Sequence, residues 1–479
     1  MFAFPSLLGL LGASFLLLSL ASPCTARSIF GHAMNGETQR YTVADYAADM
    51  RLSQMVGIDA WALNVAWYPG EPEQLEKIFA AAEETRYPVF FSFDMLHWNK
   101  ANASNVMLHD RLARWATHEQ YYRLDSKIVI STFNGAEKGT FLDGVSTFRE
   151  SNDRWNALFA SVRSQLNLEV YYAPCWLAPS PVSSEDAKDL EVDAVFNWFA
   201  WGGVGESVNV TADADGRWHD RARERGIEYW APMGHSFQAS RPLLSILSTL
   251  SRYQELIELG DRAPDHIEFV TLTDWGESTY FMPVRDTSDP PVGTIDTASY
   301  VSGHNHTAFL LLSAYYNEWY KTGVKPTITS EVVFWYHRKT PIDGLPTDDP
   351  IGRSDSCKAL SDTIYAVVLI PEGSKADKLF IATGGVFDDG HAVGPGVNLV
   401  STPFVSLRDA AGDELLGNYG VPIVRNTEIA DYNYFSYLVP VDAVPSTFMS
   451  VNGGATDAKA GGGSRAVATA LVTLIARRV

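Results

Sequence analysis

The feature that most constrains the fold of this 479-residue chain is a repeated alternation between residues 29 and 277. Short apolar runs of strand length are separated there by stretches with apolar residues at helical spacing. The runs cover residues 29–34, 58–65, 88–95, 127–133, 168–173, 194–201, 228–233 and 266–273. Strands that alternate with helices pair in parallel through right-handed crossovers. Eight such units in roughly 250 residues predict a (β/α)8 TIM barrel, an α/β fold.

An open, doubly wound sheet is the alternative architecture. The helical patterns, which cover residues 43–56, 72–85, 152–165, 217–225 and 242–259, would suit either fold. A dinucleotide-binding sheet, however, carries a G-x-G-x-x-G turn after its first strand. The corresponding residues 31–36 read GHAMNG, so the barrel is favoured.

The pattern changes after Lys325-Pro326, where strand-like runs follow one another without helical stretches. These runs cover residues 327–336, 363–370, 378–382, 396–407 and 433–440, with turn signals such as Asp-Gly between them. We predict a barrel domain over residues 27–325 and a C-terminal antiparallel β-sandwich over residues 326–450. The short connection favours a packed accessory domain over a freely tethered binding module.

The two ends of the chain are predicted to lie outside these domains. Residues 1–26 join an apolar stretch to small residues, as in a secretory signal peptide cleaved after Ala26 or Ala21. A membrane anchor is the alternative, but the stretch is short, so we expect no stable membrane span. Residues 451–479 begin rich in Gly, Ala and Ser and are predicted to form a flexible tail, with a lipid-anchor signal as the alternative.

Two further sequence features are relevant if the chain is secreted, as predicted. Asn102, Asn209 and Asn305 begin N-glycosylation triplets. The chain has three cysteines, and removal of the signal peptide would leave Cys175 and Cys357, either free or paired across the two domains. We therefore expect a glycoprotein that is secreted and located outside the cell or in the cell wall.

Charge and aromatic content narrow the class of partner. The formal net charge is −20, which would repel phosphate backbones and makes nucleic acid a poor partner. Aromatic residues make up 12% of the chain, and aromatic rings pack well on the apolar faces of sugars, although most rings are expected in the core. We expect a monomer that binds a polysaccharide.

Three acids follow predicted barrel strands, at the end where barrel enzymes build their active sites. Asp94 ends the third run, and Asp274 and Glu277 follow the eighth. Gly276 allows the chain to turn between the last two, which would bring both to one mouth. A helix cap at Asp94 and an ion pair at Asp274 are the structural alternatives. Three acids at the strand ends of one barrel favour catalysis.

Enzymes that hydrolyse glycosidic bonds use a pair of carboxyl groups. One acid protonates the leaving oxygen, and the other activates water or attacks the anomeric carbon. The chain has no G-x-S-x-G nucleophile elbow, and His32, His97 and His235 lack the spacing of metal ligands. We expect no metal and no cofactor, because acid–base chemistry on an acetal needs only positioned carboxylates.

Aromatic and amide side chains near the strand ends are the predicted sugar contacts. The predicted platforms are Trp67, Trp98, Trp176, Trp201 and Trp275. The predicted hydrogen-bonding residues are Asn64, Asn134, Asn197 and His235. Packing in the core is the alternative for each tryptophan.

Several ordered motifs between residues 29 and 339 resemble those of glycoside hydrolase family 71, the fungal α-1,3-glucanases often called mutanases. They read FGH at 30–32, GIDAWALN at 57–64, FSFDM at 91–95, ISTFNG at 130–135, FNWFAW at 196–201 and DWGES at 274–278. The resemblance implies a barrel followed by a β-sandwich, hydrolysis of α-1,3-glucan with inversion, and essential acids at Asp94, Asp274 and Glu277.

The chain also departs from the pattern of this family. Leu272-Thr273 stands where the family has Trp-Asn, and Thr279 stands where it has His. The seventh run ends in residues 231–235, APMGH, in place of a Ser-Pro-Trp ending. These changes leave the three acids in place and leave open the glucan and the mode of cleavage.

The sequence as a whole predicts a secreted fungal hydrolase of α-1,3-glucan, endo-acting or processive. A non-catalytic carbohydrate-binding protein and a hydrolase of another α-glucan linkage are the alternatives. We assign Glu277 as general acid because its longer side chain can reach a leaving oxygen, and Asp274 as base, with the reverse order as the alternative. Asp94 would stabilise positive charge at the anomeric carbon or orient the sugar.

Overall fold

The structure is a computed structural model, and the part of the chain that it describes begins at Arg27. The described residues are 27–98, 106–134, 148–176, 192–200, 211–234, 252–285, 301, 303–304, 306–327, 330–337, 364–384, 402–422, 433–439 and 473–476. Several predicted features lie outside them: the signal peptide, Asn102, Asn209, Asn305, Trp201, His235 and Cys357. No helix in the described ranges is long and apolar enough to cross a membrane.

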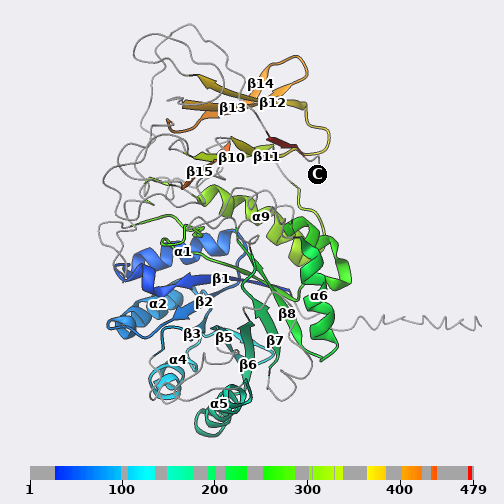
Figure 1. Ribbon diagram of the computed structural model, residues 1–479. Helices are drawn as coiled ribbons and strands as arrows, with labels where there is room; N and C mark the ends of the chain where they lie inside the picture. The colour runs from blue at the N-terminus through cyan, green and yellow to red at the C-terminus, as the bar shows by residue number, and fades with distance from the viewer. Residues whose placement is uncertain are drawn as a thin grey trace, which may run out of the picture.

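Eight parallel strands form a closed barrel, which confirms the predicted fold class (Figure 1). They are β1 (Ser28–Met34), β2 (Ala60–Val65), β3 (Val89–Asp94), β5 (Lys127–Phe133), β6 (Val170–Trp176), β7 (Ala194–Asn197), β8 (Glu228–Met233) and β9 (His266–Phe269). Pairing of β1 with β9 and of β3 with β5 closes the ring. A short strand, β4 (Arg123–Leu124), adds an antiparallel hairpin at the start of β5. Every strand of the barrel overlaps one of the predicted apolar runs.

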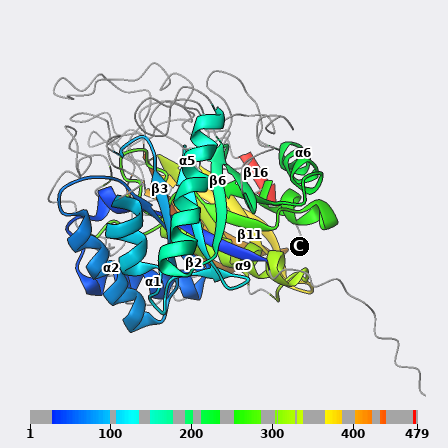
Figure 2. The ribbon, with the colours of Figure 1, turned by 90° about the horizontal axis from the view of Figure 1, so that it is seen from below.

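Helices cover the outside of the barrel, with α1, α2, α5 and α6 around the strands in Figure 2. The helical elements before α5 are η1 (Asn35–Thr38), α1 (Val43–Met55), α2 (Glu71–Thr85), the π-helical turn η2 (Met107–Leu112) and α4 (Ala113–Trp115). Those from α5 onward are α5 (Phe148–Ser161), the π-helical turn η3 (Val162–Leu166), α6 (Ala212–Arg223), the helical residues 252–258, η4 (Gly260–Arg262) and α9 (Thr307–Thr322). Local signals place their ends: Thr42 and Asp45 form a capping box at α1, and Gly323 ends α9 with a left-handed φ of 70°.

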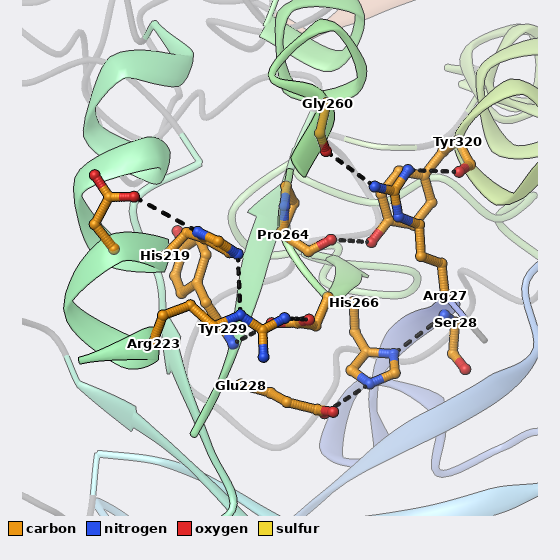
Figure 3. A network of polar contacts seen from close by, with 12 residues as sticks. Arg27, Ser28, His219, Arg223, Glu228, Tyr229, Gly260, Pro264, His266 and Tyr320 are labelled. Atoms are coloured by element: carbon orange, nitrogen blue, oxygen red, sulfur yellow. Dashed lines mark hydrogen bonds and ion pairs between the residues drawn. The ribbon is translucent and has the colours of Figure 1, made fainter. Parts of the chain in front are cut away.

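A polar network ties the barrel together at the amino ends of its strands (Figure 3). The backbone N–H of Ser28 donates to His266 Nδ1 at 3.1 Å, and His266 Nε2 lies 3.1 Å from Glu228 Oε2. Arg27 donates to the carbonyls of Gly260 at 3.1 Å and of Tyr320 at 3.2 Å. These bonds join β1, β8, β9 and α9 at the face opposite to the strands' carboxyl ends.

The region after the barrel forms two sheets that pack face to face. One sheet has the order β15 (Tyr434–Val439), β10 (Glu331–His337), β11 (Tyr365–Leu369) and β16 (Thr473–Ala476); the other has the order β12 (Ala376–Gly384), β13 (Thr402–Asp409) and β14 (Glu414–Tyr419). Val332, Phe334, Val405 and Leu407 are among the residues of the shared core. The sequence prediction missed β14, and β16 is a strand, parallel to β11, where the sequence predicts a flexible tail.

Strand β10, in the sheet that lies nearer the barrel, is buried on both faces. Along β10, Val332 and Phe334 face the outer sheet, whereas Val333 and Trp335 belong to the core of the barrel domain, as the two-residue period of a strand requires. Trp335 packs edge-on against Phe309 of α9, with ring centroids 5.4 Å apart. This sheet lies directly on α9 in Figure 1, so the sandwich and the barrel share one continuous core.

Candidate active site

Asp274 and Glu277 lie in the loop that follows β9, here named the 270–279 loop. Strand β9 ends at Phe269, four residues earlier than the predicted run, so neither acid stands on extended backbone. The backbone N–H of Asp274 donates to Thr271 Oγ1 at 3.0 Å, and the N–H of Glu277 donates to Asp274 Oδ1 at 2.9 Å. The turn through Gly276 therefore keeps the two acids together at the mouth of the barrel.

The loop is fastened to β1 and to the 3-10 helix η1 that follows it. The backbone N–H of Leu272 donates to the carbonyl of His32 at 2.7 Å, and that of Met34 donates to Thr273 Oγ1 at 2.8 Å. Gly31 makes room for this packing, because a Cβ atom there would lie 2.5 Å from the Leu272 side chain. The first and last strands thus hold the 270–279 loop in one position.

Burial raises the pKa of the Asp274 carboxyl towards neutral pH. The side chain is buried, and desolvation raises its pKa to about 6. Hydrogen bonds from the backbone of Glu277 and Gly276 and the charge of His32 act in the opposite direction. A carboxyl with a pKa near the working pH suits a general base.

His32 occupies the barrel interior beside this acid. Its Nδ1 lies 2.7 Å from Glu268 Oε1, and both side chains are fully buried. Its Nε2 lies 3.2 Å from Asn64 Nδ2, and its ring packs edge-on against Trp198 with centroids 4.8 Å apart. Asn64, predicted to contact sugar, therefore contacts His32 in this structure.

Glu37 is an acid of the site that the sequence reasoning missed. It lies in η1, and its backbone carbonyl accepts a hydrogen bond from Trp275 Nε1 at 3.0 Å. Burial, together with the smaller effect of the negative charges of Asp274 and Glu277, raises the pKa of its carboxyl to about 8. The sequence signal that could have found Glu37 is its position three residues after the end of β1. Acids that follow a barrel strand, such as those after β9, lie at the mouth of the barrel.

Asp94 ends β3, at the same mouth. Its carboxylate is buried and accepts from the backbone N–H of Leu96 at 3.1 Å. His97 Nδ1 lies 3.1 Å from the other carboxylate oxygen, and this bond raises the pKa of His97. Residues 95–97 form a turn, so Asp94 caps this turn and not a helix as the structural alternative expected, and its other carboxylate oxygen has a histidine partner at the surface.

The tryptophans predicted as sugar platforms differ in exposure. Trp67, after β2, is 40% exposed, whereas Trp98 is 4% and Trp275 is 6% exposed. The indole N–H of Trp98 donates to the carbonyl of Val65 at 2.8 Å. The Trp98 ring packs edge-on against Trp67, with ring centroids 5.8 Å apart. Leu96 and Phe199, which follow β3 and β7, are also exposed apolar side chains at this mouth, and the sequence reasoning missed both.

The other residues predicted to contact sugar, Asn134, Asn197 and Trp176, differ in their surroundings. Asn134 follows β5, is buried, and has a left-handed φ of 56°. Asn197, at the end of β7, donates to Tyr229 Oη at 2.8 Å, and that hydroxyl donates to Asp215 Oδ1 at 2.7 Å. Asn197 is therefore part of a buried network with α6. Trp176 ends β6, and only its backbone is described.

A closed parallel barrel with acids at the end of β3 and in the loops after β1 and β9 is the architecture of a barrel glycoside hydrolase. In the described ranges, no group of three or more His, Cys, Asp or Glu could hold a metal ion. The sequence model of Glycosyl hydrolase family 71 matches residues 25–434. The chain belongs to this family, as its motifs led us to expect.

Two curated proteins are similar over most of their length. One is a glucan endo-1,3-alpha-glucosidase of Schizosaccharomyces pombe, 24% identical over 86% of this chain and 94% of that protein. The other is a mutanase of Penicillium rubens, 26% identical over 73% of this chain and 74% of that protein. Among solved structures, a GH99 endo-alpha-mannosidase from Bacteroides thetaiotaomicron has a TM-score of 0.44, 12% identity, and coverage of 59% of this chain and 81% of its own.

Proposed function

We propose that this protein hydrolyses α-1,3-glucosidic bonds of fungal wall α-glucan, as a secreted enzyme that inverts the anomeric centre. The observation that carries the proposal is the position of Asp274 and Glu277, held together in the 270–279 loop of a family 71 barrel. The names of the similar proteins support the linkage. The apolar amino-terminal stretch supports secretion, and similarity to an ascus wall endo-1,3-alpha-glucanase supports a wall substrate.

The proposed reaction needs two proton transfers. Glu277, half-exposed beyond Gly276, gives its proton to the glycosidic oxygen as the bond to the anomeric carbon breaks. Asp274 takes a proton from a water molecule that attacks the opposite face of that carbon. The first product then has the β configuration. Asp94, with His97 beside it, orients the sugar or stabilises the positive charge on the ring.

Incubation with insoluble α-1,3-glucan, followed by measurement of new reducing ends, tests this function. Release of sugar from this polymer, and none from α-1,4- or α-1,6-linked polymers, is expected. Binding without release would show a non-catalytic carbohydrate-binding protein, and release from another polymer would show a different linkage specificity.

The activity should depend on the ionisation of Asp274. Because the base must be ionised and its pKa in the free enzyme is about 6, kcat/KM should fall by about tenfold per pH unit below pH 6. The measurement is the pH profile of kcat/KM on soluble α-1,3-linked oligosaccharides. A profile that stays flat down to pH 4 would remove the base role from Asp274.

Trp67 and Trp98 form a matched pair for testing sugar contact. Trp67→Ala should raise the Kd for α-1,3-glucan about tenfold, or about 1.4 kcal/mol, with little change in Tm, because the ring is exposed. Trp98→Ala should instead lower the free energy of unfolding by about 3–5 kcal/mol, because that ring is buried. Binding isotherms and thermal unfolding separate the two effects. Unchanged affinity in Trp67→Ala would show that Trp67 is not a platform.

A further inference from the structure

Glu37 stands where the loops after β1 and β9 meet. The indole N–H of Trp275 donates to its backbone carbonyl, and the next residues along the 270–279 loop include Glu277. The backbone N–H of Met34 also donates to Thr273 Oγ1, so two side chains of the loop bond to the backbone of β1 and η1 and set the position of Glu37 relative to the two acids. Its carboxyl lies close enough to Asp274 and Glu277 for their charges to act on it.

The environment of this carboxyl disfavours a negative charge. Its Oε2 atom is buried and accepts no hydrogen bond from any residue in the described part of the chain. A buried carboxylate oxygen without a donor is costly, whereas the protonated acid needs no such donor. The charged groups that act on the carboxyl, Asp274 and Glu277, are both negative, and burial and these charges raise its pKa to about 8. Glu37 is therefore protonated near neutral pH.

We propose that Glu37 is a fourth carboxyl of the active site, beside Asp94, Asp274 and Glu277, which stores a proton and supplies it to Glu277. This inference rests on the proposed glucan hydrolysis. Neither the family match nor the similar proteins assign a role to this residue.

The proton transfers balance over one turnover. The O–H of Glu37 gives its proton to the carboxylate of Glu277, directly or through one water molecule, and Glu277 gives it to the glycosidic oxygen as the C–O bond breaks. Asp274 accepts a proton from the attacking water, whose oxygen forms the new bond to the anomeric carbon. Loss of that proton from Asp274 to solvent and uptake of one by Glu37 restore the free enzyme. The sum is hydrolysis, with one water consumed.

Glu37→Gln tests the transfer, because glutamine keeps the size of the side chain but holds no transferable proton. Its kcat/KM on α-1,3-glucan should fall on the order of 10²-fold, whereas on α-glucosyl fluoride, whose leaving group needs little protonation, it should stay within about threefold. Adding Glu37→Gln to Glu277→Gln should cause little further loss on the polymer, because both act in one transfer. Glu83→Gln, an exposed charge removal on α2, is the control and should change neither activity. Full activity of Glu37→Gln on the polymer, or equal loss on both substrates, would overturn the proposal.

A second measurement does not depend on activity. Between pH 4.5, the ordinary pKa of a glutamate, and about 8, the folded chain keeps a proton on Glu37 that the unfolded chain releases. The stability of the wild type should therefore fall relative to Glu37→Gln as pH rises through this window. The Tm difference between the two proteins should grow from pH 5 to 8 and then level off. A difference independent of pH would refute the stored proton, whereas wild type that cleaves no glucan but shows this dependence would refute only the proposed function.

Discussion

Asp274→Asn should be inactive on both α-1,3-glucan and α-glucosyl fluoride, whereas Glu277→Gln should lose activity on the polymer and retain much of it on the fluoride. The fluoride needs little help from a general acid but still needs a base to activate water. Each loss should be on the order of 10²–10⁴-fold or more in kcat/KM. The assignment depends on geometry: Asp274 is buried and held by the Thr271 hydroxyl, and Glu277 is half-exposed beyond Gly276.

Two controls make this result decisive. The Tm of each variant shows whether the fold survives, since Asp274 also accepts the N–H of Glu277. Proton NMR of the first product identifies its anomeric configuration, and a β product supports inversion. If Asp274→Asn is the variant that the fluoride rescues, the roles of acid and base are exchanged. An α product would rule out the inverting mechanism.

A chain that ends at residue 325 should be insoluble or unfolded at 25 °C, although it retains all eight barrel strands. Truncation would expose the side of α9 that Trp335 and Leu438 cover, including Phe309. It would also remove Asn433, whose amide donates to Tyr280 Oη at 3.0 Å, immediately after the 270–279 loop. Large apolar surfaces of this kind drive aggregation. Soluble yield, Tm and glucanase activity of residues 27–325 provide the measurement.

Point variants in the full chain provide the matched control for this truncation. Trp335→Ala, at a fully buried ring that faces the barrel, should reduce the free energy of unfolding by about 3–5 kcal/mol. Leu415→Ala, on the exposed side of β14, should leave the Tm nearly unchanged. A soluble and fully active 27–325 fragment would show that the sandwich is dispensable for the barrel.

The sequence by itself determined the barrel. Each apolar run, such as residues 127–133 or 228–233, became a strand because a parallel strand covered on both faces must be apolar along its whole length. The polar residues at the ends of these runs, Asp94 among them, lie at the carboxyl ends of the strands because parallel pairing leaves no other choice. The sequence motifs also resemble those of glycoside hydrolase family 71, and the match of the family model over residues 25–434 confirmed this family.

Only the tertiary structure decided which side chains meet. Periodicity cannot tell that Trp67 is exposed while Trp98 lies beneath it, because both follow strands and both are large and apolar. The orientation of Asn197 toward Tyr229, and the pairing of β16 with β11, likewise depend on neighbours distant in sequence. Glu37 comes within reach of the charges of Asp274 and Glu277, about 240 residues away in the chain, because the closed barrel places β1 beside β9. Long-range closure of the barrel, which no local pattern encodes, therefore assembled the carboxyls of the site.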